Sequence, residues 1–453
     1  MQPSLARPIT LLHATALVVG IIIGASIFVQ PSVITGAVSS VSTVYVVWLV
    51  SGFLTLLGAL IAAELASAYP KAGGVYVFLK EAFGPGVGFL WGWAMFWTMH
   101  TGIIAAIATV FARYFATWMP MDDVGLKVTA IVAVLVLSAV NYVGVRQGSL
   151  VQTTFTLMKV GAVLAIIFIA FVLRGRIHPF AAFRPGHLEV LTAIDASLPV
   201  VPLTAGRFSL GLVAGLFAFG GWHMVTYAAE ETRDPERTIP RALTIGVLLV
   251  TVCYIALNAA YFRVLTPAEV AGSTRVAADA AMLVVGKTGA ALVAAIVVVS
   301  TLGALNGVIL AGPRVYLSMS RDGLLWKWAG EIHSRFRTPH RAIVIQGIWA
   351  CVLIATGSYR VLFTRVVYTE WIFFALMAMG LMRLRARADY RPAYRVRGYP
   401  AVPIVFAMCS LYVVASQVVA TPAESITGLL FVAAGWPVFL LTTRFADHDH
   451  RRP

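Results

Sequence analysis

The stretch Gly20-Ile-Ile-Ile-Gly-Ala-Ser-Ile-Phe28 lies inside an apolar run that begins near Leu11 and ends at Gln30-Pro31. Glycine lowers helix propensity by about 1 kcal/mol, and a backbone group freed in hydrocarbon needs another partner. A Gly-xxx-Gly face packed on a neighbouring helix would also explain the pattern. However, a second stretch, Gly215-Leu-Phe-Ala-Phe-Gly-Gly-Trp222, interrupts a later apolar run. Two broken segments in corresponding halves of a chain indicate a transporter binding site.

The composition is that of a membrane protein with many spans. Of the 453 residues, 60% are hydrophobic and 12% are charged, which excludes an ordinary soluble enzyme. Apolar runs of about 20 residues can each cross a bilayer. The sequence predicts twelve spans, at 11–31, 43–68, 86–115, 124–144, 151–173, 209–229, 240–262, 278–312, 341–356, 361–382, 401–420 and 425–443. The two interruptions fall in the first and the sixth.

These runs predict one transmembrane domain over residues 11–443, between short tails at 1–10 and 444–453. The net charge is +15. With the N-terminus inside, about two thirds of the Lys and Arg residues fall in inner segments, as the positive-inside rule requires. We therefore expect a multi-pass protein of the cell (inner) membrane with both termini cytoplasmic. This charge distribution makes a nucleic-acid surface unnecessary. The N-terminus lacks a signal peptide with a small-residue cleavage site, so the first run should be retained.

Two segments are expected on the outer side. Residues 174–208 form the longest loop, whose length suggests a lid or a surface elaboration. Thr266 followed by Pro267, with Glu269 three residues after Thr266, predicts the capped start of a short helix.

Three ionisable residues inside predicted spans are candidates for a functional role. Lys159 lies well inside the fifth, where a lysine costs several kcal/mol unless it meets carbonyls, hydroxyls or water. We favour a functional, inward-facing ammonium over one that reaches the membrane surface. Glu370 lies in the tenth span, and its predicted partner is His223, directly after Trp222. A structural ion pair and a substrate- or proton-linked role both remain open.

The sequence contains no recognisable enzyme or metal site. Cys253, Cys351 and Cys409 lie in three different spans and form neither a metal-binding spacing nor a disulfide framework. No nucleophile–base constellation or metal cluster emerges, so we expect neither an enzyme nor a cofactor. A channel would be expected to have a repeated pore motif or rings of like charge, and neither is found.

Taken in order, the motifs resemble the amino acid–polyamine–organocation transporter family, especially its L-type amino acid transporter-like bacterial branch. Each motif alone is weak, but their common order is specific. They are Gly20–Phe28, Tyr69-Pro-Lys-Ala-Gly-Gly74, Gly215–Trp222, Glu230-Glu231 with Asp234-Pro235, Ala304-Leu-Asn-Gly307 with Gly312-Pro-Arg314, and Arg395-Val-Arg-Gly-Tyr-Pro400.

The resemblance implies an all-α polytopic membrane protein with a LeuT-type fold. Spans one to five, about 11–173, and six to ten, about 209–382, would form inverted repeats. The first helix of each repeat, helix 1 and helix 6, would be discontinuous. Two accessory helices, about 401–443, would follow.

The resemblance also implies a substrate site. The substrate carboxylate would meet exposed N–H groups at a half-helix N-terminus. The substrate ammonium would face carbonyls left free in both breaks. Phe217 matches the aromatic gate of the family. The implied carboxylate contacts are Gly24, Ala25 and Ser26, and the implied ammonium contacts are around Ile23, Phe217 and Gly220.

Lys159 matches the fifth-span lysine of sodium-independent family members, whose ammonium replaces the sodium that braces the first helix against the eighth. The matching partners would be the Gly20 carbonyl and the Ser300 hydroxyl, although Thr301 could be the neighbour instead. Burial disfavours a charged amine, so Lys159 could couple transport to protons. It could equally stay charged as a brace, which would suit an exchanger.

The chain departs from the family pattern at the predicted site. Ala25-Ser26 stands where animal L-type transporters have Ser-Gly, and His223 and Glu370 stand where they have asparagines. These changes put a strictly neutral, large-amino-acid specificity in doubt. Animal members also carry a loop cysteine that links a heavy subunit. Residues 116–124 contain none, so we expect no disulfide-linked partner.

The leading prediction is a sodium-independent secondary transporter of small or neutral L-amino acids, working by alternating access through exchange or with protons. The alternative is a cationic amino acid or polyamine carrier, in which Glu370 would face the distal positive charge of the substrate. A channel or membrane sensor is the alternative from a different class. The expected partners are an amino acid and the lipid bilayer, together with protons if transport is proton-coupled.

Overall fold

The computed structural model describes residues 5–24, 26–38, 40–172, 203–273, 275–357 and 368–449. Within them the chain is helical, apart from turns, loops and one isolated β-bridge between Ile9 and Thr232. The predicted outer loop at 174–208 lies largely outside the described residues. The predicted short helix after Thr266 is confirmed as α12 (Pro267–Gly272). The Thr266 hydroxyl accepts from the Glu269 N–H, and the Glu269 carboxylate accepts from the Thr266 N–H.

The helices follow the predicted order. The segment predicted as the first repeat contains α1 (Leu11–Ile22), α2 (Ser26–Val38), α3 (Val41–Ala68), α4 (Val75–Phe83), α5 (Pro85–Ala94), the π-helical turn η1 (Met95–Met99), α6 (His100–Phe115), α7 (Asp123–Val143) and α8 (Val145–Val172). The second contains α10 (Ala205–Ala218), η3 (Trp222–Glu231), α11 (Pro235–Val264), α12 (Pro267–Gly272), α13 (Val276–Val285), α14 (Lys287–Ala311), α15 (Pro313–Arg321), η4 (Lys327–Gly330), α16 (His340–Thr356) and α18 (Thr369–Arg385). The accessory helices are α19 (Ala401–Ala420), α20 (Pro422–Ala433) and α21 (Gly435–Asp449).

In the described part of the chain, nine helices are long and apolar enough to cross a membrane, and the bent pair α1–α2 would make a tenth. The all-α membrane fold is therefore confirmed. The predicted ninth span corresponds to the 17-residue helix α16, and the predicted tenth to α18, which begins at Thr369. The start of that tenth run, 361–367, lies outside the described residues. The count of twelve stays a prediction.

The limits of several predicted spans differ from those of the helices by a few residues, and two differences change the assignment. The run 278–312 is not one helix, because Gly286 adopts a positive φ of 76° and separates α13 from α14. A residue with a side chain rarely adopts that conformation, so glycine stops the helix there. At the other end of the chain, α21 continues to Asp449, into the segment predicted as a tail.

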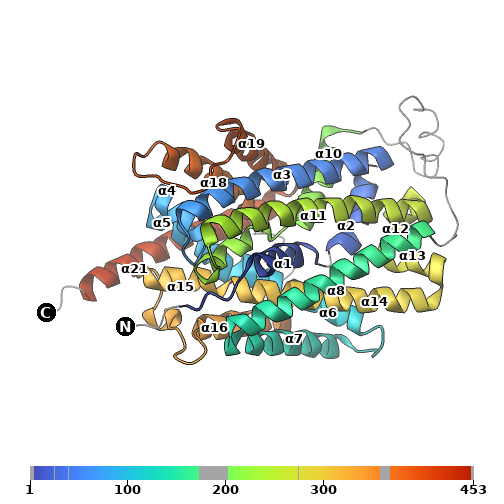
Figure 1. Ribbon diagram of the computed structural model, residues 1–453, viewed down its shortest axis with the longest axis horizontal. Coiled ribbons are helices and arrows are strands. Elements are labelled where there is room, and N and C mark those ends of the chain that lie inside the picture. The colour runs from blue at the N-terminus through green and yellow to red at the C-terminus, as the bar shows by residue number, and fades with distance from the viewer. Residues whose placement is uncertain are drawn as a thin grey trace.

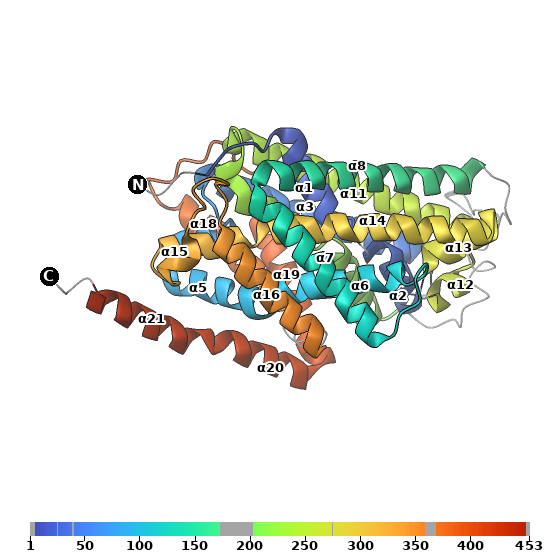
Figure 2. The ribbon, with the colours of Figure 1, turned by 90° about the horizontal axis from the view of Figure 1, so that it is seen from below.

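The discontinuous helices lie at the centre of the bundle. Helix α1 packs against α8, α11 and α14, while α10 packs against α2 and α3. Both chain termini lie at one end of the molecule, opposite α12 and α13 (Figure 1). Helices α20 and α21 extend along one edge, away from α1 (Figure 2). The central helices α1 and α10 are therefore surrounded by other helices of the bundle.

Candidate functional site

The first break separates α1 from α2, whose axes are bent by 45°. Helix α1 ends at Ile22, and Ile23 leaves the helical conformation with a ψ of 76°. The Gly24 N–H then donates to the Ile22 carbonyl at 2.8 Å. Ala25, a predicted carboxylate contact, lies outside the described residues. A real interruption at Gly20–Phe28 is therefore present, and it is more than a packing face.

Lys159 extends from α8 into this break and is 1% exposed. Its ammonium donates to the carbonyls of Gly20 at 2.8 Å, Ile23 at 2.8 Å and Ser300 at 2.9 Å. The predicted contact with the Ser300 hydroxyl differs from the structure, because the ammonium binds the Ser300 carbonyl instead. The hydroxyl donates to the Ile23 carbonyl at 3.1 Å. Lys159 thus joins α1, α8 and α14 through one charged group.

Thr301 is not the neighbour of Lys159. Its hydroxyl donates to carbonyls of its own helix, at Val297 and Val298. The Ile23 carbonyl, which was expected to be free for a substrate ammonium, accepts both Lys159 and the Ser300 hydroxyl. A carbonyl oxygen has two lone pairs, so these bonds use the acceptor capacity of Ile23.

The second break follows α10, which ends at Ala218. Gly221 has a φ of +86°, and a Cβ there would lie 2.3 Å from the Ile21 side chain on α1. Both the backbone conformation and the close approach to α1 therefore require glycine. The chain continues as the 3₁₀-helical segment η3. The two breaks lie side by side at the middle of the bundle.

A cavity of about 650 Å³ borders both breaks. It reaches from α1 and α10 to α6, α18 and the accessory helices α19 and α20. Five predicted site residues line it: Gly24, Ser26, Phe217, Gly220 and Glu370. Ile23, His223, Gly20, Lys159 and Ser300 are not among the described residues that line it. These five residues therefore lie next to the breaks without forming the cavity wall.

His223 and Glu370 lie together, as predicted, with 3.5 Å between His223 Nε2 and Glu370 Oε1. Their positions differ in one respect from a shared substrate contact, because Glu370 lines the cavity and His223 does not. The His223 ring is fully buried among aromatic rings. Those rings belong to Trp91, Trp222, Tyr227 and Phe374. His223 therefore stands behind the cavity wall and contacts residues that form it, which are Glu370, Trp222 and Phe374.

Two of the helices that line the cavity lie toward the end of the molecule opposite the termini. They are α2, which contributes Val29 and Val33, and α10, which contributes Leu210 and Val213 (Figure 1). None of the described residues of α4, α5 or α15, at the other end, lines the cavity.

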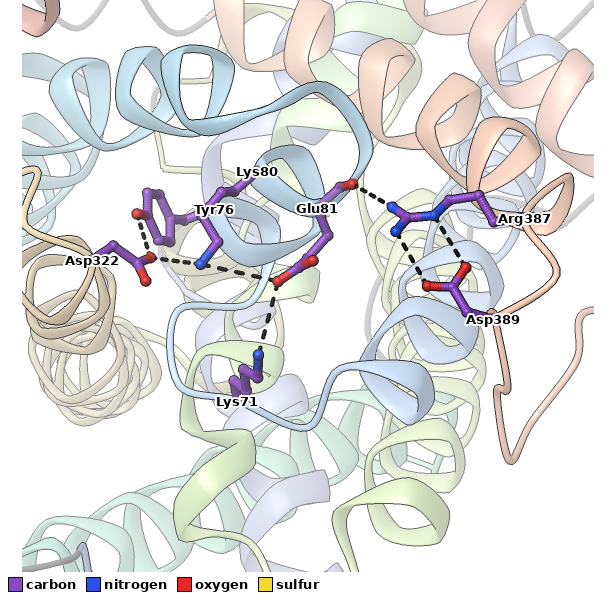
Figure 3. Close-up of polar contacts among 7 residues, drawn as sticks. All are labelled: Lys71, Tyr76, Lys80, Glu81, Asp322, Arg387 and Asp389. Atoms are coloured by element: carbon purple, nitrogen blue, oxygen red, sulfur yellow. Dashed lines mark hydrogen bonds and ion pairs between the residues drawn. The ribbon is translucent and has the colours of Figure 1, made fainter.

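The end that carries the termini contains two sets of polar contacts. Arg314 and Glu231 form a buried ion pair, with Arg314 Nε donating to Glu231 Oε2 at 2.8 Å. A second network surrounds α4 (Figure 3), and its members are Lys71, Tyr76, Lys80, Glu81, Asp322, Arg387 and Asp389. In it, Asp322 accepts from Lys80 at 2.8 Å and from the Tyr76 hydroxyl at 2.7 Å. Burial, followed by the Asp322 hydrogen bond, raises the pKa of Tyr76, so its phenol stays protonated.

A polar face on α8 was not recognised from the sequence. Gln152 and Thr156 precede Lys159 at helical spacing, and all three side chains are buried. The Thr156 hydroxyl donates to the Ala16 carbonyl at 2.9 Å, and Gln152 accepts from Asn306 at 3.1 Å. The signal was available, because polar residues at i, i+4 and i+7 mark one side of the fifth span. Their partners on other helices could not be assigned from spacing.

The chain matches the amino acid permease family over residues 9–442. It is 32% identical to the b(0,+)-type amino acid transporter 1 of Mus musculus over 447 residues, which cover 97% of this chain and 88% of that protein. It is 31% identical to the serine/threonine exchanger SteT of Bacillus subtilis (strain 168), with 96% of each chain covered. The human cystine/glutamate transporter is 28% identical over 96% of this chain and 85% of its own length. The chain therefore belongs to the amino acid permease family and is a multi-pass membrane transporter of amino acids rather than an enzyme.

Proposed function

We propose that this protein exchanges small or neutral L-amino acids across the cell membrane by alternating access, without sodium. The observation that carries the proposal is the Lys159 ammonium, which bridges carbonyls of the first break and of Ser300. A fixed positive charge there braces α1 against α14 without a metal ion. SteT is named a serine/threonine exchanger, which supports small neutral substrates.

The carboxylate of the amino acid would bind at the start of α2. Gly24 and Ser26 line the cavity there, and the first N–H groups of a helix have no partner within it. The helix dipole also favours a negative charge at this end. We keep Ala25 as a proposed contact because it joins these two residues.

The ammonium of the substrate would face the carbonyl ends of α1 and α10. Ile22 and Ala218 are the last residues of these helices, and both line the cavity. The negative end of each helix dipole therefore points at the same region. The Ile23 carbonyl accepts Lys159 and the Ser300 hydroxyl, and the Ile22 carbonyl accepts the Gly24 N–H and the Tyr254 hydroxyl. The helix dipole of α1 and the Ala218 carbonyl of α10 would therefore make this contact. Phe217 is 38% exposed on the cavity wall, and it would cover the bound amino acid as a gate.

The cavity would face the outside of the cell. The distribution of basic residues supports cytoplasmic termini, and two helices that line the cavity, α2 and α10, lie toward the opposite end of the molecule (Figure 1). The Arg314–Glu231 pair and the network around α4 would keep the inner end closed in this state. We assign the protein to the inner membrane, with both termini cytoplasmic and no disulfide-linked heavy subunit.

A cationic substrate is the second candidate, and one observation favours it. Glu370 and Glu424 line the cavity, whereas no Lys or Arg from the described parts of the chain does so. A carboxylate near a substrate attracts a distal positive charge. Alanine, leucine, arginine and putrescine should therefore be compared as competitors of labelled alanine uptake. If arginine or putrescine competed best, the neutral assignment would be wrong.

The decisive experiment is reconstitution of the purified protein into liposomes with a panel of amino acids. Counterflow should saturate and should require an amino acid inside the vesicles. Runs with and without an imposed pH gradient separate exchange from proton-coupled transport, and runs with and without sodium test sodium independence. Uptake that did not saturate would support a channel instead.

A further inference from the structure

A segment rich in arginine joins α18 to α19, and we call residues 383–397 the arginine loop. It contains six arginines and a single acidic residue, Asp389. The arginines are Arg383, Arg385, Arg387, Arg391, Arg395 and Arg397. Arg387 donates to the Glu81 carbonyl of α4 at 3.3 Å, so the loop lies at the end of the molecule that carries the termini (Figure 1). Amino acid transport does not account for this concentration of positive charge.

Buried polar groups fix the arginine loop to α3. Glu64 on α3 is fully buried, and its carboxylate accepts from Arg385 Nε at 2.7 Å and from the Val396 N–H at 2.6 Å. The Ser67 hydroxyl, also on α3, accepts from the Tyr394 N–H at 3.0 Å. These contacts hold the loop backbone at two points. The arginine side chains therefore extend from a backbone with a defined position on the bundle.

Two of the arginines are paired within the protein. Glu64 binds Arg385, and Arg387 donates to both carboxylate oxygens of Asp389 (Figure 3). The other four are exposed, and none of them forms an ion pair with a carboxylate in the described part of the chain. They are Arg383, Arg391, Arg395 and Arg397. The arginine loop thus presents four positive charges that an external anion can neutralise.

The surface next to the arginine loop is apolar. Helix α19 follows directly and is long and apolar enough to cross a membrane. Ile404 and Met408, one turn apart near its start, are 40% and 58% exposed. Tyr399 is 41% exposed, and the Arg385 guanidinium lies 4.1 Å from the centroid of its ring. Tyrosine is enriched at membrane–water interfaces. Unpaired positive charge and exposed apolar side chains therefore meet at one membrane boundary.

We propose that the arginine loop binds anionic phospholipids of the inner leaflet. Arg391, Arg395 and Arg397 contact the headgroup phosphate, and the acyl chains lie against the start of α19. Clusters of four to eight basic residues directly beside a membrane helix attract anionic lipids. The positive-inside rule explains on which side the loop lies, but it does not explain the buried contacts that fix the loop backbone. This inference uses the proposed orientation of the termini and is independent of the substrate.

The test measures lipid binding directly. The protein is purified in a neutral detergent and titrated with phosphatidylglycerol or with phosphatidylcholine of the same acyl chains, and bound lipid is counted by native mass spectrometry. The wild-type protein should retain phosphatidylglycerol in preference. The test variant combines Arg391→Gln, Arg395→Gln and Arg397→Gln. Each basic residue near an anionic surface contributes about fivefold in binding, so the apparent affinity for phosphatidylglycerol should fall about tenfold or more.

A second triple variant controls for net charge. Arg237→Gln, Arg241→Gln and Arg335→Gln remove the same charge from exposed positions outside the arginine loop. This control should bind phosphatidylglycerol within about twofold of the wild type. An equal loss in both triple variants would overturn the proposal, as would equal binding of phosphatidylcholine and phosphatidylglycerol by the wild type. Displacement of the lipid by an equal concentration of inorganic phosphate would also overturn it, because the site would then bind a free anion.

A charge-preserving variant keeps the test decisive if the glutamine variant does not fold. Arg391→Lys, Arg395→Lys and Arg397→Lys together retain all three charges, so phosphatidylglycerol binding should stay within about threefold of the wild type. A folded lysine variant that lost binding about tenfold would contradict recognition by charge. The readout requires no transport. A failure of amino acid exchange would therefore leave this result unchanged, and the two proposals fail separately.

Discussion

The Lys159 ammonium offers the sharpest test of the transport mechanism. Lys159→Met keeps a side chain of similar length and removes all three N–H donors. The carbonyls of Gly20, Ile23 and Ser300 then lose their charged partner. Two of these carbonyls belong to the first break and one to α14. The variant therefore removes the hydrogen bonds through which Lys159 joins α1 to α14.

The size of the effect can be estimated from these bonds. A hydrogen bond to a charged group contributes about 1.5–3 kcal/mol, and burial of the ammonium offsets part of the sum by several kcal/mol. We expect a net loss of about 2 kcal/mol in the free energy that holds the substrate site in its binding arrangement. This loss corresponds to roughly a 30-fold change in the equilibrium constant for that arrangement. We therefore expect the initial rate of alanine exchange to fall about 30-fold at subsaturating substrate.

The assay is counterflow of labelled alanine in proteoliposomes, normalised to the amount of monodisperse protein. Lys127→Met is the control. Lys127 is partly exposed, and its ion pair with Asp123 at 3.7 Å links neighbouring turns of one helix. Exposed pairs of this kind contribute about 0–1 kcal/mol, so its exchange rate should change less than about fivefold. Exchange by Lys159→Met at the wild-type rate across the pH range would refute the bracing role.

Three further predictions, made on four variants, test other contacts of the protein. His223→Asn and Glu370→Gln should be coupled by about 0.5–3 kcal/mol in a double-mutant cycle on KM, and independent effects would remove the proposed link between them. Gly20→Ala should slow exchange or lower the melting temperature by the equivalent of about 1–3 kcal/mol. The reason is that the alanine Cβ would lie 2.2 Å from Gln152 Nε2. A variant that matched the wild type in both measurements would contradict this prediction. Arg314→Met leaves a buried carboxylate unpaired and should destabilise the protein by about 3–5 kcal/mol in thermal unfolding, so an unchanged melting temperature would show that the pair does not matter.

The transmembrane organisation could be read from local chemistry. Apolar length and charge distribution act through the bilayer, which treats each span separately. The break at Gly20–Phe28, the break at Gly215–Trp222 and the cap at Thr266 were therefore visible in short stretches. The run 278–312 was misjudged, since one glycine in an apolar segment does not reveal its φ.

The sequence by itself determined that the chain is a helical membrane transporter with two interrupted helices and a buried lysine beside the first. Tertiary structure alone decided which donors and acceptors form hydrogen bonds with one another and which side chains line the cavity. It directed Lys159 to the Ser300 carbonyl instead of its hydroxyl, gave Glu370 but not His223 a place on the cavity wall, and set the Tyr254 hydroxyl between the ends of α1 and α10. The physical reason is that these contacts join residues far apart in the chain. A hydrogen bond depends on distances of a few tenths of an ångström, and only the packed helices fix them.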